Sequence, residues 1–171
     1  KYGLELIDCK HLETHGGSMR YYFKKSSVAS ASSNLSKQIE IEDSLGIKNI
    51  DTYQKFSKNC EFAKSAFKKS LELHKAENHR IVGYGATSKS TTILNYCDVG
   101  SDLIDFFVDT TPIKQNTYTP GKHIPVLPYT DFTPHPEVAV LFAWNHKAEI
   151  MSKEKEFTGK WITHLYEEFS G

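Results

Sequence analysis

Continuous apolar runs divide the second half of the chain and predict strands. They are Ile81–Val82, Leu103–Asp109, Ile124–Leu127, Val138–Phe142 and Trp161–Leu165. Runs that are continuous rather than alternating are typical of parallel strands buried on both faces. Because helical patterns separate these runs, the sequence predicts an α/β fold: a Rossmann-like, mostly parallel sheet with helices on both faces.

The most periodic segment precedes this region. Side chains that are mainly apolar recur there every three or four residues and form one stripe: Tyr53, Phe56, Cys60, Ala63, Phe67, Leu71 and His74. This spacing predicts a helix about 40 Å long that crosses over into the strand at Ile81. Asp51 and Gln54 are spaced as a capping box at its start, and residues 76–79 predict its end. Its lysine-rich face is expected to lie in water rather than to recruit an anionic partner.

Two shorter runs near the N-terminus, Leu4–Asp8 and Met19–Phe23, predict strands. In the second run apolar and polar side chains alternate, as they do in a half-buried strand. His15, Gly16 and Gly17 lie between the runs and predict a turn, so the region is expected to form a β-hairpin. An isolated hairpin is only marginally stable in water, which favours membership of a larger sheet.

A small, polar segment, Ser26–Ser36, has too few apolar residues to pack by itself. We expect a mobile linker here. A short helix should follow, with Leu35, Ile39 and Leu45 on its apolar side. Gly46 would end it in the left-handed conformation.

One glycine-containing turn, in the segment RIVGYGATSKSTTILNYC (80–97), organises the predicted sheet. Gly83 and Gly85 permit a tight turn and close backbone approach. A helix follows, and its free N–H groups and dipole favour an anion such as phosphate, to which Lys89 adds a full charge. Position 88 is serine where a dinucleotide fingerprint has its third glycine, and the order of a P-loop is absent. A turn that binds no ligand therefore stays an alternative.

Two further polar segments are expected at the same edge of the sheet. Asp109 ends the next strand and lies 24 positions after Gly85, near the place of the ribose-binding acid in doubly wound folds. Trp144 and Asn145 follow the last long apolar run, and Asn145 is a candidate N-cap for a helix over 146–157. Carboxyl ends of parallel strands share one edge, so these segments are predicted to line one cleft with the turn.

Composition narrows the class of protein. Lysine plus arginine and aspartate plus glutamate both number 21 in 171 residues, so no net field indicates nucleic acid or an anionic membrane as a partner. No apolar run approaches the roughly 20 residues that span a bilayer. Cys9, Cys60 and Cys97 are widely spaced and unpaired in sequence. This spacing argues against a disulfide framework and a cysteine zinc site, and it favours a cytoplasmic location.

Four segments together carry a specific resemblance. They are HGGSMR (15–20), GYGATSKSTTILNYC (83–97), LIDFFVDTTPIKQNTYTPGKHIPV (103–126) and LFAWNHKAEIM (141–151). These segments resemble the C-terminal domain of the S-adenosylmethionine-dependent sugar C-methyltransferases, enzymes that add a branching methyl group to nucleotide-linked deoxysugars. The likeness spans about residues 4–166.

The resemblance implies three parts in this chain. Residues 1–25 would be the last, antiparallel hairpin of an upstream class I methyltransferase core, 26–78 a linker with helices, and 79–171 the Rossmann-like C-terminal domain. In this family the zinc-binding cysteines, the S-adenosylmethionine motif and the catalytic tyrosine, glutamate and histidine lie upstream. We therefore expect this chain alone to be inactive, with no catalytic residue, cofactor site or metal site of its own.

The turn, the strand ends and the resemblance together give the predicted substrate-binding residues. They are Gly83, Gly85, Thr87, Ser88, Lys89, Ser90, Thr91, Asn95, Asp109, Lys114, Gln115, Trp144 and Asn145. Lys114 and Gln115 lie on a long, proline-containing loop, the kind of element that carries function on a rigid scaffold. Interdomain or sugar-side roles are predicted for His15, Arg20 and His123. Ser90 and Asn116 stand where the family usually has glycine, and Ala143 where it has proline.

Three functions remain open at this point. The first is the substrate-side domain of a nucleotide-sugar C-methyltransferase, in which a base outside this chain would remove the proton next to a keto group before methyl transfer. The second is a dinucleotide-binding module of an oxidoreductase, which the missing third glycine disfavours. The third is a non-enzymatic scaffold domain. In the first case the partners would be the nucleotide sugar and the upstream methyltransferase domain.

Overall fold

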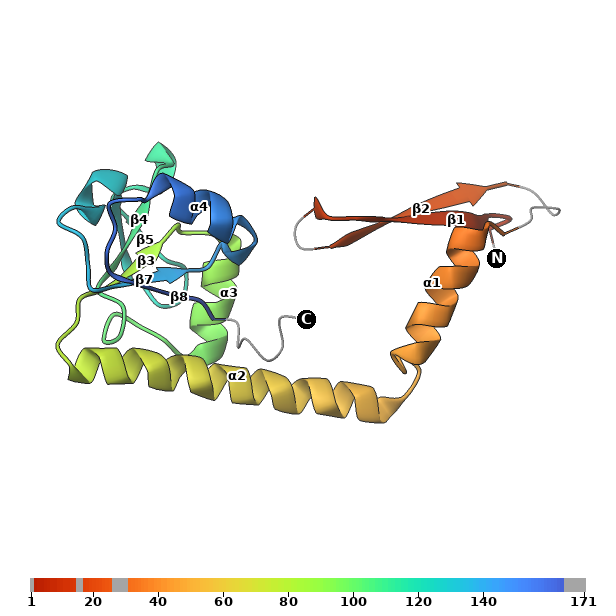
Figure 1. Cartoon of the computed structure of the whole chain (residues 1–171), viewed down its shortest axis with the longest axis horizontal. Coiled ribbons are helices and arrows are strands. Elements are labelled where there is room, and N and C mark those ends of the chain that lie inside the picture. The colour runs from red at the N-terminus through yellow and green to blue at the C-terminus, as the bar shows by residue number, and fades with distance from the viewer. Residues whose placement is uncertain (1, 15–16, 26–30, 165–171) are drawn as a thin grey trace. The chain divides into compact units, whose positions relative to one another are not determined.

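A computed structural model of the chain describes residues 2–14, 17–25 and 31–164. The chain divides into two compact units, Lys1–Lys58 and Asn59–Gly171, which are described separately below (Figure 1). Among the described helices, none combines the length and the apolarity that crossing a membrane requires.

The first unit contains a hairpin and a helix. Strand β1 (Glu5–Leu12) pairs antiparallel with β2 (Ser18–Lys24), so the predicted hairpin is confirmed. Helix α1 (Ser33–Ser44) packs against β1 through the buried Leu35. Gly46 follows the helix with φ +65°, in the predicted left-handed conformation.

Two expectations about this unit are wrong. The linker was expected to extend to Ser36, but α1 already begins at Ser33, because the Ser32 Oγ accepts the N–H of Leu35 and caps the helix. Residues 26–30 of that predicted linker lie outside the described residues. The second strand was expected to be half-buried, but Tyr21 and Phe23 are exposed, since the described residues of this unit form a sheet of two strands.

Helix α2 (Ile50–Ala76) is the long predicted helix. It starts one residue before Asp51, and the Asn49 side chain accepts the N–H of Asp51 at 2.9 Å, so the predicted Asp51–Gln54 capping box is wrong. It ends as expected before Asn78, whose φ is 59°. The apolar stripe is buried only in its second half: Phe67 and Leu71 pack into the core, whereas Tyr53 is 53% exposed and Phe56 67% exposed.

The second unit is built on a six-stranded sheet. Its strands are β3 (Ile81–Tyr84), β4 (Phe106–Asp109), β5 (Thr117–Tyr118), β6 (Pro125–Pro128), β7 (Val138–Leu141) and β8 (Lys160–Ile162). They lie in the order β5-β6-β4-β3-β7-β8, and every pairing is parallel except that of β5 with β6. The predicted mostly parallel α/β fold is confirmed.

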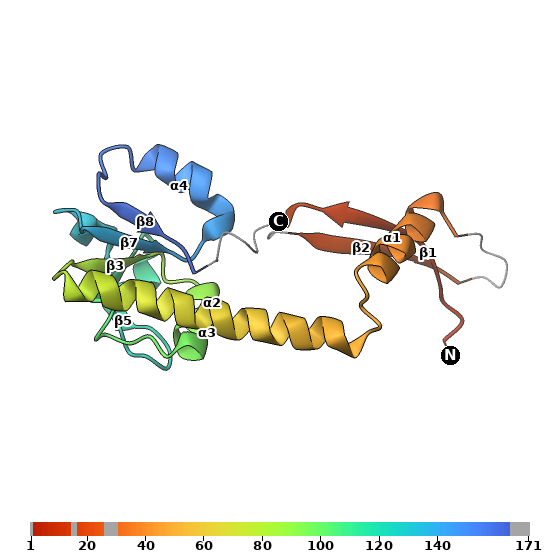
Figure 2. The same cartoon turned by 60° about the horizontal axis from the view of Figure 1, so that its bottom comes forward.

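Helices cover both faces of this sheet (Figure 2). They are α3 (Ser88–Cys97), α4 (Lys147–Lys153) and the 3-10 turns η2 (Pro112–Lys114), η3 (Tyr129–Phe132) and η4 (Trp144–His146). Helices α2 and α3 pack on one face through Phe67, Leu71 and Leu94. On the opposite face, η3 contributes Phe132 and α4 contributes Ile150. Successive residues of β3 and β7 alternate between these two cores, as the pleat of a strand requires.

Gly83 lies inside β3, where it is buried between strands and helices. A Cβ atom at this position would lie 2.5 Å from the Phe107 ring of the neighbouring β4. Such a distance is shorter than any van der Waals contact, and Phe107 is itself fully buried and stacked on Phe142. The glycine is therefore required by packing within the sheet.

The first prediction concerns this contact. Gly83→Ala should lower the free energy of unfolding by about 1–3 kcal/mol, because the added methyl group overpacks a closed core. Urea unfolding of the 171-residue chain measures the change. Phe107→Leu in the same background should restore part of the loss, since the two positions are in contact. Equal stability of Gly83→Ala and the parent chain would contradict the packing role.

Candidate functional site

The sheet of the second unit has a topological switch point beside β3. From β3 the chain passes through α3 to β4 on one side, whereas β7 lies on the other side and leads through α4 to β8. In open α/β sheets, the crevice outside the carboxyl ends of such diverging strands is where ligands bind. The turn after β3, the loop after β4 and the η4 turn after β7 all lie at this edge, as the sequence predicted.

A capping box closes the start of α3. The Thr87 Oγ1 accepts the N–H of Ser90 at 3.1 Å, and the Ser90 Oγ accepts the N–H of Thr87 at 2.9 Å. The hydroxyls of Ser90 and Thr91 both donate to the Thr87 carbonyl oxygen, at 2.6 Å and 3.4 Å. Three of the four hydroxyls predicted to face a ligand thus form hydrogen bonds within the start of α3. The fourth belongs to Ser88, which is exposed.

Few backbone N–H groups remain open at this helix start. Those of Ala86, Thr87 and Ser90 are occupied by side chains. The first N–H groups of a helix have no intrahelical acceptor. For Ser88 and Lys89, the described part of the chain supplies no other acceptor. These two N–H groups are what the turn can offer to an anion.

Asp109 joins the turn after β3 to the loop after β4. Its Oδ2 accepts the N–H of Ala86 at 2.8 Å and lies 3.2 Å from the Lys114 Nζ, and its Oδ1 accepts the N–H of Thr111 at 2.8 Å. The residue is 7% exposed. Burial raises the pKa of this carboxyl, but the bonds from Thr111 and the charge of Lys114 outweigh it, so the pKa lies below its ordinary 3.8. The predicted position of Asp109, facing the Gly85 turn, is confirmed.

The loop after β4 is more ordered than the sequence predicted, since it contains η2 and β5. The Gln115 side chain donates to the Asp109 carbonyl oxygen at 2.9 Å. Asn116 has φ 60°, and its N–H donates to the Val126 carbonyl oxygen at 2.7 Å. Asparagine tolerates this left-handed conformation, which explains how it can occupy a position where the resembling proteins have glycine.

Lys89 reaches across the switch point. Its ammonium donates to the Asn145 Oδ1 at 2.6 Å and lies 5.5 Å from the centre of the Trp144 ring. The predicted grouping of Lys89, Trp144 and Asn145 is thus observed. The predicted N-cap role of Asn145 is wrong, because α4 begins only at Lys147, after η4, and no side chain caps it.

Two hollows open beside the turn. The first, of about 280 Å³, is lined by Ala86, Thr87, Ser88, Ser90, Thr91, Ile113, Lys114, Thr117, Tyr118, Thr119, Pro120 and Val126. The second, of about 230 Å³, is lined by Tyr84, Gly85, Val108, Asp109, Thr110, Tyr129, Glu149, Ile150 and Lys153. The turn therefore lies between two hollows that each hold some of the predicted binding residues, whereas Lys89, Gln115, Trp144 and Asn145 line neither.

Two predicted contact residues are engaged elsewhere in the second unit. Gly83 is buried within β3 against Phe107. The Asn95 amide donates to the carbonyl oxygens of Thr91 and Pro120, at 2.8 Å and 3.0 Å, and so ties α3 to the loop before β6. Substrate contacts for Gly83 and Asn95 stay predictions.

Of the three residues predicted for the sugar side, His123 is the one among the described residues of the second unit. His123 precedes β6 and is exposed at the amino edge of the sheet, opposite the turn. Arg20 is an exposed residue of β2 in the first unit, and His15 lies outside the described residues. Their roles also stay predictions.

A buried polar network at this edge was missed by the sequence reasoning. The hydroxyl groups of Tyr84 and Tyr129 both donate to the Glu154 carboxylate at 2.6 Å, and Glu154 is 8% exposed. Burial, followed by the hydrogen bond to Glu154 and the charge of this residue, raises the pKa of Tyr129 to about 12. Glu154 stands in a run of charged residues that resembles a solvated helix end, so no local pattern could identify it.

His164, just after β8, was missed as well. Its ring stacks on Phe142 at a centroid distance of 5.9 Å, and its Nδ1 is buried without a hydrogen-bond partner among the described residues. Burial, followed by the charge of Lys89, lowers the pKa of His164 to about 4.

The fold defines a Rossmann-like α/β domain whose polar residues converge at the carboxyl edge of its sheet. Residues 13–165 match the family described as the C-methyltransferase C-terminal domain, and the chain belongs to this family. The chain is also 30% identical over 158 residues to the C-methyltransferase NovU of Streptomyces niveus. That alignment covers 91% of this chain and 38% of NovU, so the chain spans well under half of this relative's length. The resemblance inferred from the sequence is confirmed.

A second prediction tests the Asp109 contacts. Asp109→Asn should lower the free energy of unfolding by about 1.5–3 kcal/mol. The asparagine amide is neutral, and its NH2 group, a donor, takes the place of one carboxylate oxygen that accepts hydrogen bonds here. Since the folded pKa is depressed, the native contribution is full above pH 3.8 and is lost as the pH falls through the lower folded value. Denaturant unfolding at pH 7 and pH 3 measures both effects. Asp131→Asn, at an exposed position, is the matched control and should change stability by less than about 0.5 kcal/mol.

A third prediction concerns His164. Its folded pKa of about 4 lies below the ordinary 6.5, so its contribution to stability is present above pH 6.5 and is lost as the pH falls towards 4. His164→Phe, which cannot take up a proton, should make the stability curve flatter in this window. Unfolding measured from pH 7 to pH 4 compares the two proteins, with His123→Phe at an exposed position as control. An unchanged slope in His164→Phe would show that the ring is not held neutral.

Proposed function

We propose that this chain is the C-terminal, substrate-side domain of an S-adenosylmethionine-dependent C-methyltransferase that acts on a nucleotide-linked deoxysugar. Family membership and the likeness to NovU support a C-methyltransferase. In this proposal the chain alone is inactive, and it binds the anionic part of the nucleotide sugar while the upstream methyltransferase domain carries the reaction. The three free cysteines support a cytoplasmic location.

One observation carries the proposal: the Lys89 ammonium at the switch point has neutral partners. It is held by the Asn145 amide oxygen and lies near the Trp144 ring. Among the described residues, no ion pair with a carboxylate includes Lys89. The charge is therefore positioned but not neutralised, which is the arrangement that an anionic ligand needs.

The neighbouring groups complete an anion site in this proposal. The N–H groups of Ser88 and Lys89 point from the helix start, where the dipole favours negative charge. Lys114 lines the 280 Å³ hollow beside them. A diphosphate could accept hydrogen bonds from the two N–H groups and from Lys89, with the remainder of the nucleotide sugar in the hollow.

S-adenosylmethionine would supply the methyl group, and we place its site and the catalytic base outside this chain. The one glycine-containing strand–turn–helix here is closed by its own side chains, since Asp109 and Ser90 occupy the N–H groups of Ala86 and Thr87. The task left to this domain is to hold the substrate by its phosphates. Binding energy from such a remote group can orient the reacting carbon.

The same contacts weigh against a dinucleotide-binding module. A ribose-binding carboxylate must accept from the ligand, but both oxygens of Asp109 already accept from the chain and the residue is almost fully buried. A non-enzymatic scaffold is disfavoured by the family match.

A fourth prediction tests the role of Lys89 in the enzyme that carries this domain. Lys89→Ala should weaken nucleotide-sugar binding about tenfold or more, because a charge-assisted hydrogen bond contributes about 1.5–3 kcal/mol. Calorimetric titration with the nucleotide sugar measures the change, and binding to the parent enzyme should weaken as salt rises.

Lys69→Ala, which removes one charge from an exposed position on α2, is the matched control and should bind as the parent does. A folded Lys89→Ala enzyme with undiminished affinity would leave Lys89 as a structural residue that only joins α3 to η4.

A further inference from the structure

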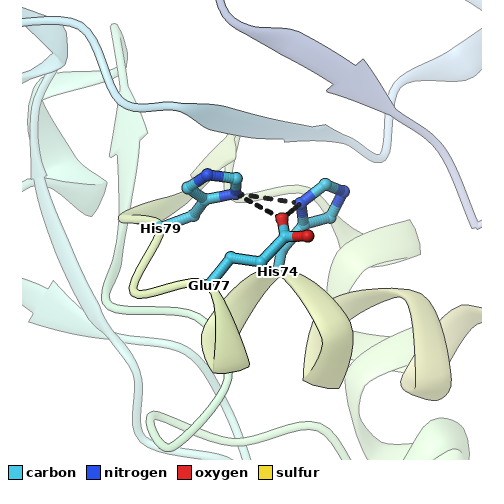
Figure 3. Close-up of side chains that lie close together, drawn as sticks. All are labelled: His74, Glu77 and His79. Atoms are coloured by element: carbon cyan, nitrogen blue, oxygen red, sulfur yellow. Dashed lines mark hydrogen bonds and ion pairs between the residues drawn. The ribbon is translucent and has the colours of Figure 1, made fainter.

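Three potential metal ligands converge where α2 ends and β3 begins (Figure 3). His74 lies in the last turn of α2, Glu77 follows the helix, and His79 lies two residues before β3. The two Nδ1 atoms are 3.0 Å apart, and the Glu77 Oε2 lies 3.6 Å from that of His74 and 3.3 Å from that of His79. The cluster lies entirely within the second unit.

The backbone around the cluster is fixed by the end of the helix. Asn78 adopts φ 59°, and its N–H donates to the Lys75 carbonyl oxygen at 2.9 Å. The N–H of His79 donates to the His74 carbonyl oxygen at 3.1 Å, which turns the His79 ring back over the last helical turn. Lys75 in turn binds the Asp105 carboxylate at 2.6 Å. The local backbone structure thus brings the three residues close together.

Hydrogen bonds within this cluster cannot give all three facing atoms, the two Nδ1 nitrogens and the Glu77 oxygen, a favourable partner. A neutral imidazole carries one N–H, so a hydrogen bond between the two Nδ1 atoms uses one proton and leaves the other nitrogen a lone pair. The Glu77 carboxylate then faces a lone pair and repels it. A cation among the three atoms would satisfy all of them at once.

We propose that His74, Glu77 and His79 form a binding site for a divalent transition-metal ion such as Zn²⁺. Zinc binds imidazole nitrogen and carboxylate oxygen at about 2.0–2.2 Å, and in a tetrahedron such ligands lie about 3.3 Å apart. The three observed distances between the ligand atoms, 3.0, 3.3 and 3.6 Å, lie within about 0.3 Å of this value. Three protein ligands leave the fourth position to water.

The donor set also selects the class of metal. Imidazole nitrogen suits Zn²⁺, Cu²⁺ and Ni²⁺, whereas Mg²⁺ and Ca²⁺ prefer oxygen ligands. The ligands are reachable from solvent, since the His79 side chain is 33% exposed and that of Glu77 is 63% exposed. Lys160 lies near His74 and opposes a cation, and Glu137 lies near His79 and favours one. The site uses none of the three cysteines. It departs from the expectation, drawn from the sequence, that this chain has no metal site.

The test uses the 171-residue chain, free of histidine tags and stripped with a chelator. Calorimetry should show one Zn²⁺ bound per chain, and Mg²⁺ should give no binding. Cobalt(II) should produce the strong visible absorption of tetrahedral coordination without the near-ultraviolet thiolate band. His74→Ala and His79→Ala should each weaken Zn²⁺ binding at least about tenfold, a loss seen even for residues that only support metal ligands. Binding should weaken as the pH falls and the histidines take up protons.

His123→Ala is the control, because this exposed histidine lies outside the cluster, and its Zn²⁺ affinity should equal that of the parent. Full Zn²⁺ affinity in a folded His74→Ala/His79→Ala double variant would overturn the proposal and point to the thiols. If the variants do not fold, the cobalt spectrum of the parent decides. A thiolate band or no tetrahedral absorption would also overturn the proposal.

Discussion

The buried carboxylate of Asp109 is the contact on which the carboxyl edge of the domain depends. A buried charge is costly unless it is paired and hydrogen-bonded, and this one receives two backbone N–H groups and the Lys114 ammonium. Its donors come from two different connections, one after β3 and one after β4. Asp109 therefore fixes the start of α3 against the loop that contains η2, and with it the positions of Thr111 and Lys114.

At this edge, some polar residues are occupied by contacts within the chain, whereas others are still available to a ligand. The hydroxyls of Thr87 and Ser90 and the Asp109 carboxylate are occupied by the chain, so they hold the turn in place. Lys89 donates a hydrogen bond to Asn145, a neutral partner that leaves the positive charge of the ammonium uncompensated. An anion arriving here would meet a cation and N–H groups already in position, so little ordering of the protein would oppose binding.

The parallel strands of the second unit could be predicted because continuous apolar runs indicate burial on both faces, and Asp109 because it ends such a run. The short, exposed β5 carries no such run and was not predicted. The length of α2 followed from its periodicity, but the stripe could not show that only the half with Phe67 and Leu71 meets a sheet. The capping prediction failed at Asp51 because the neighbouring Asn49 accepts an N–H group at the helix start. It failed at Asn145 because η4 precedes α4 and the Asn145 amide oxygen binds Lys89 instead. Glu154 has no local signal, since two tyrosines distant in sequence bury it.

Strand β3 connects two chemically different edges of the sheet. It begins two residues after the His79 ring and ends at the Gly85 turn, and its four residues span about 13 Å. Charges at opposite edges of the sheet that lie farther apart than the Debye length, about 8 Å at physiological salt, are largely screened from each other. Metal binding would therefore stabilise the junction of α2 and β3 without competing with Lys89 for an anion. Loss of the metal and loss of the anion site should consequently act separately, the first on stability and the second on substrate affinity.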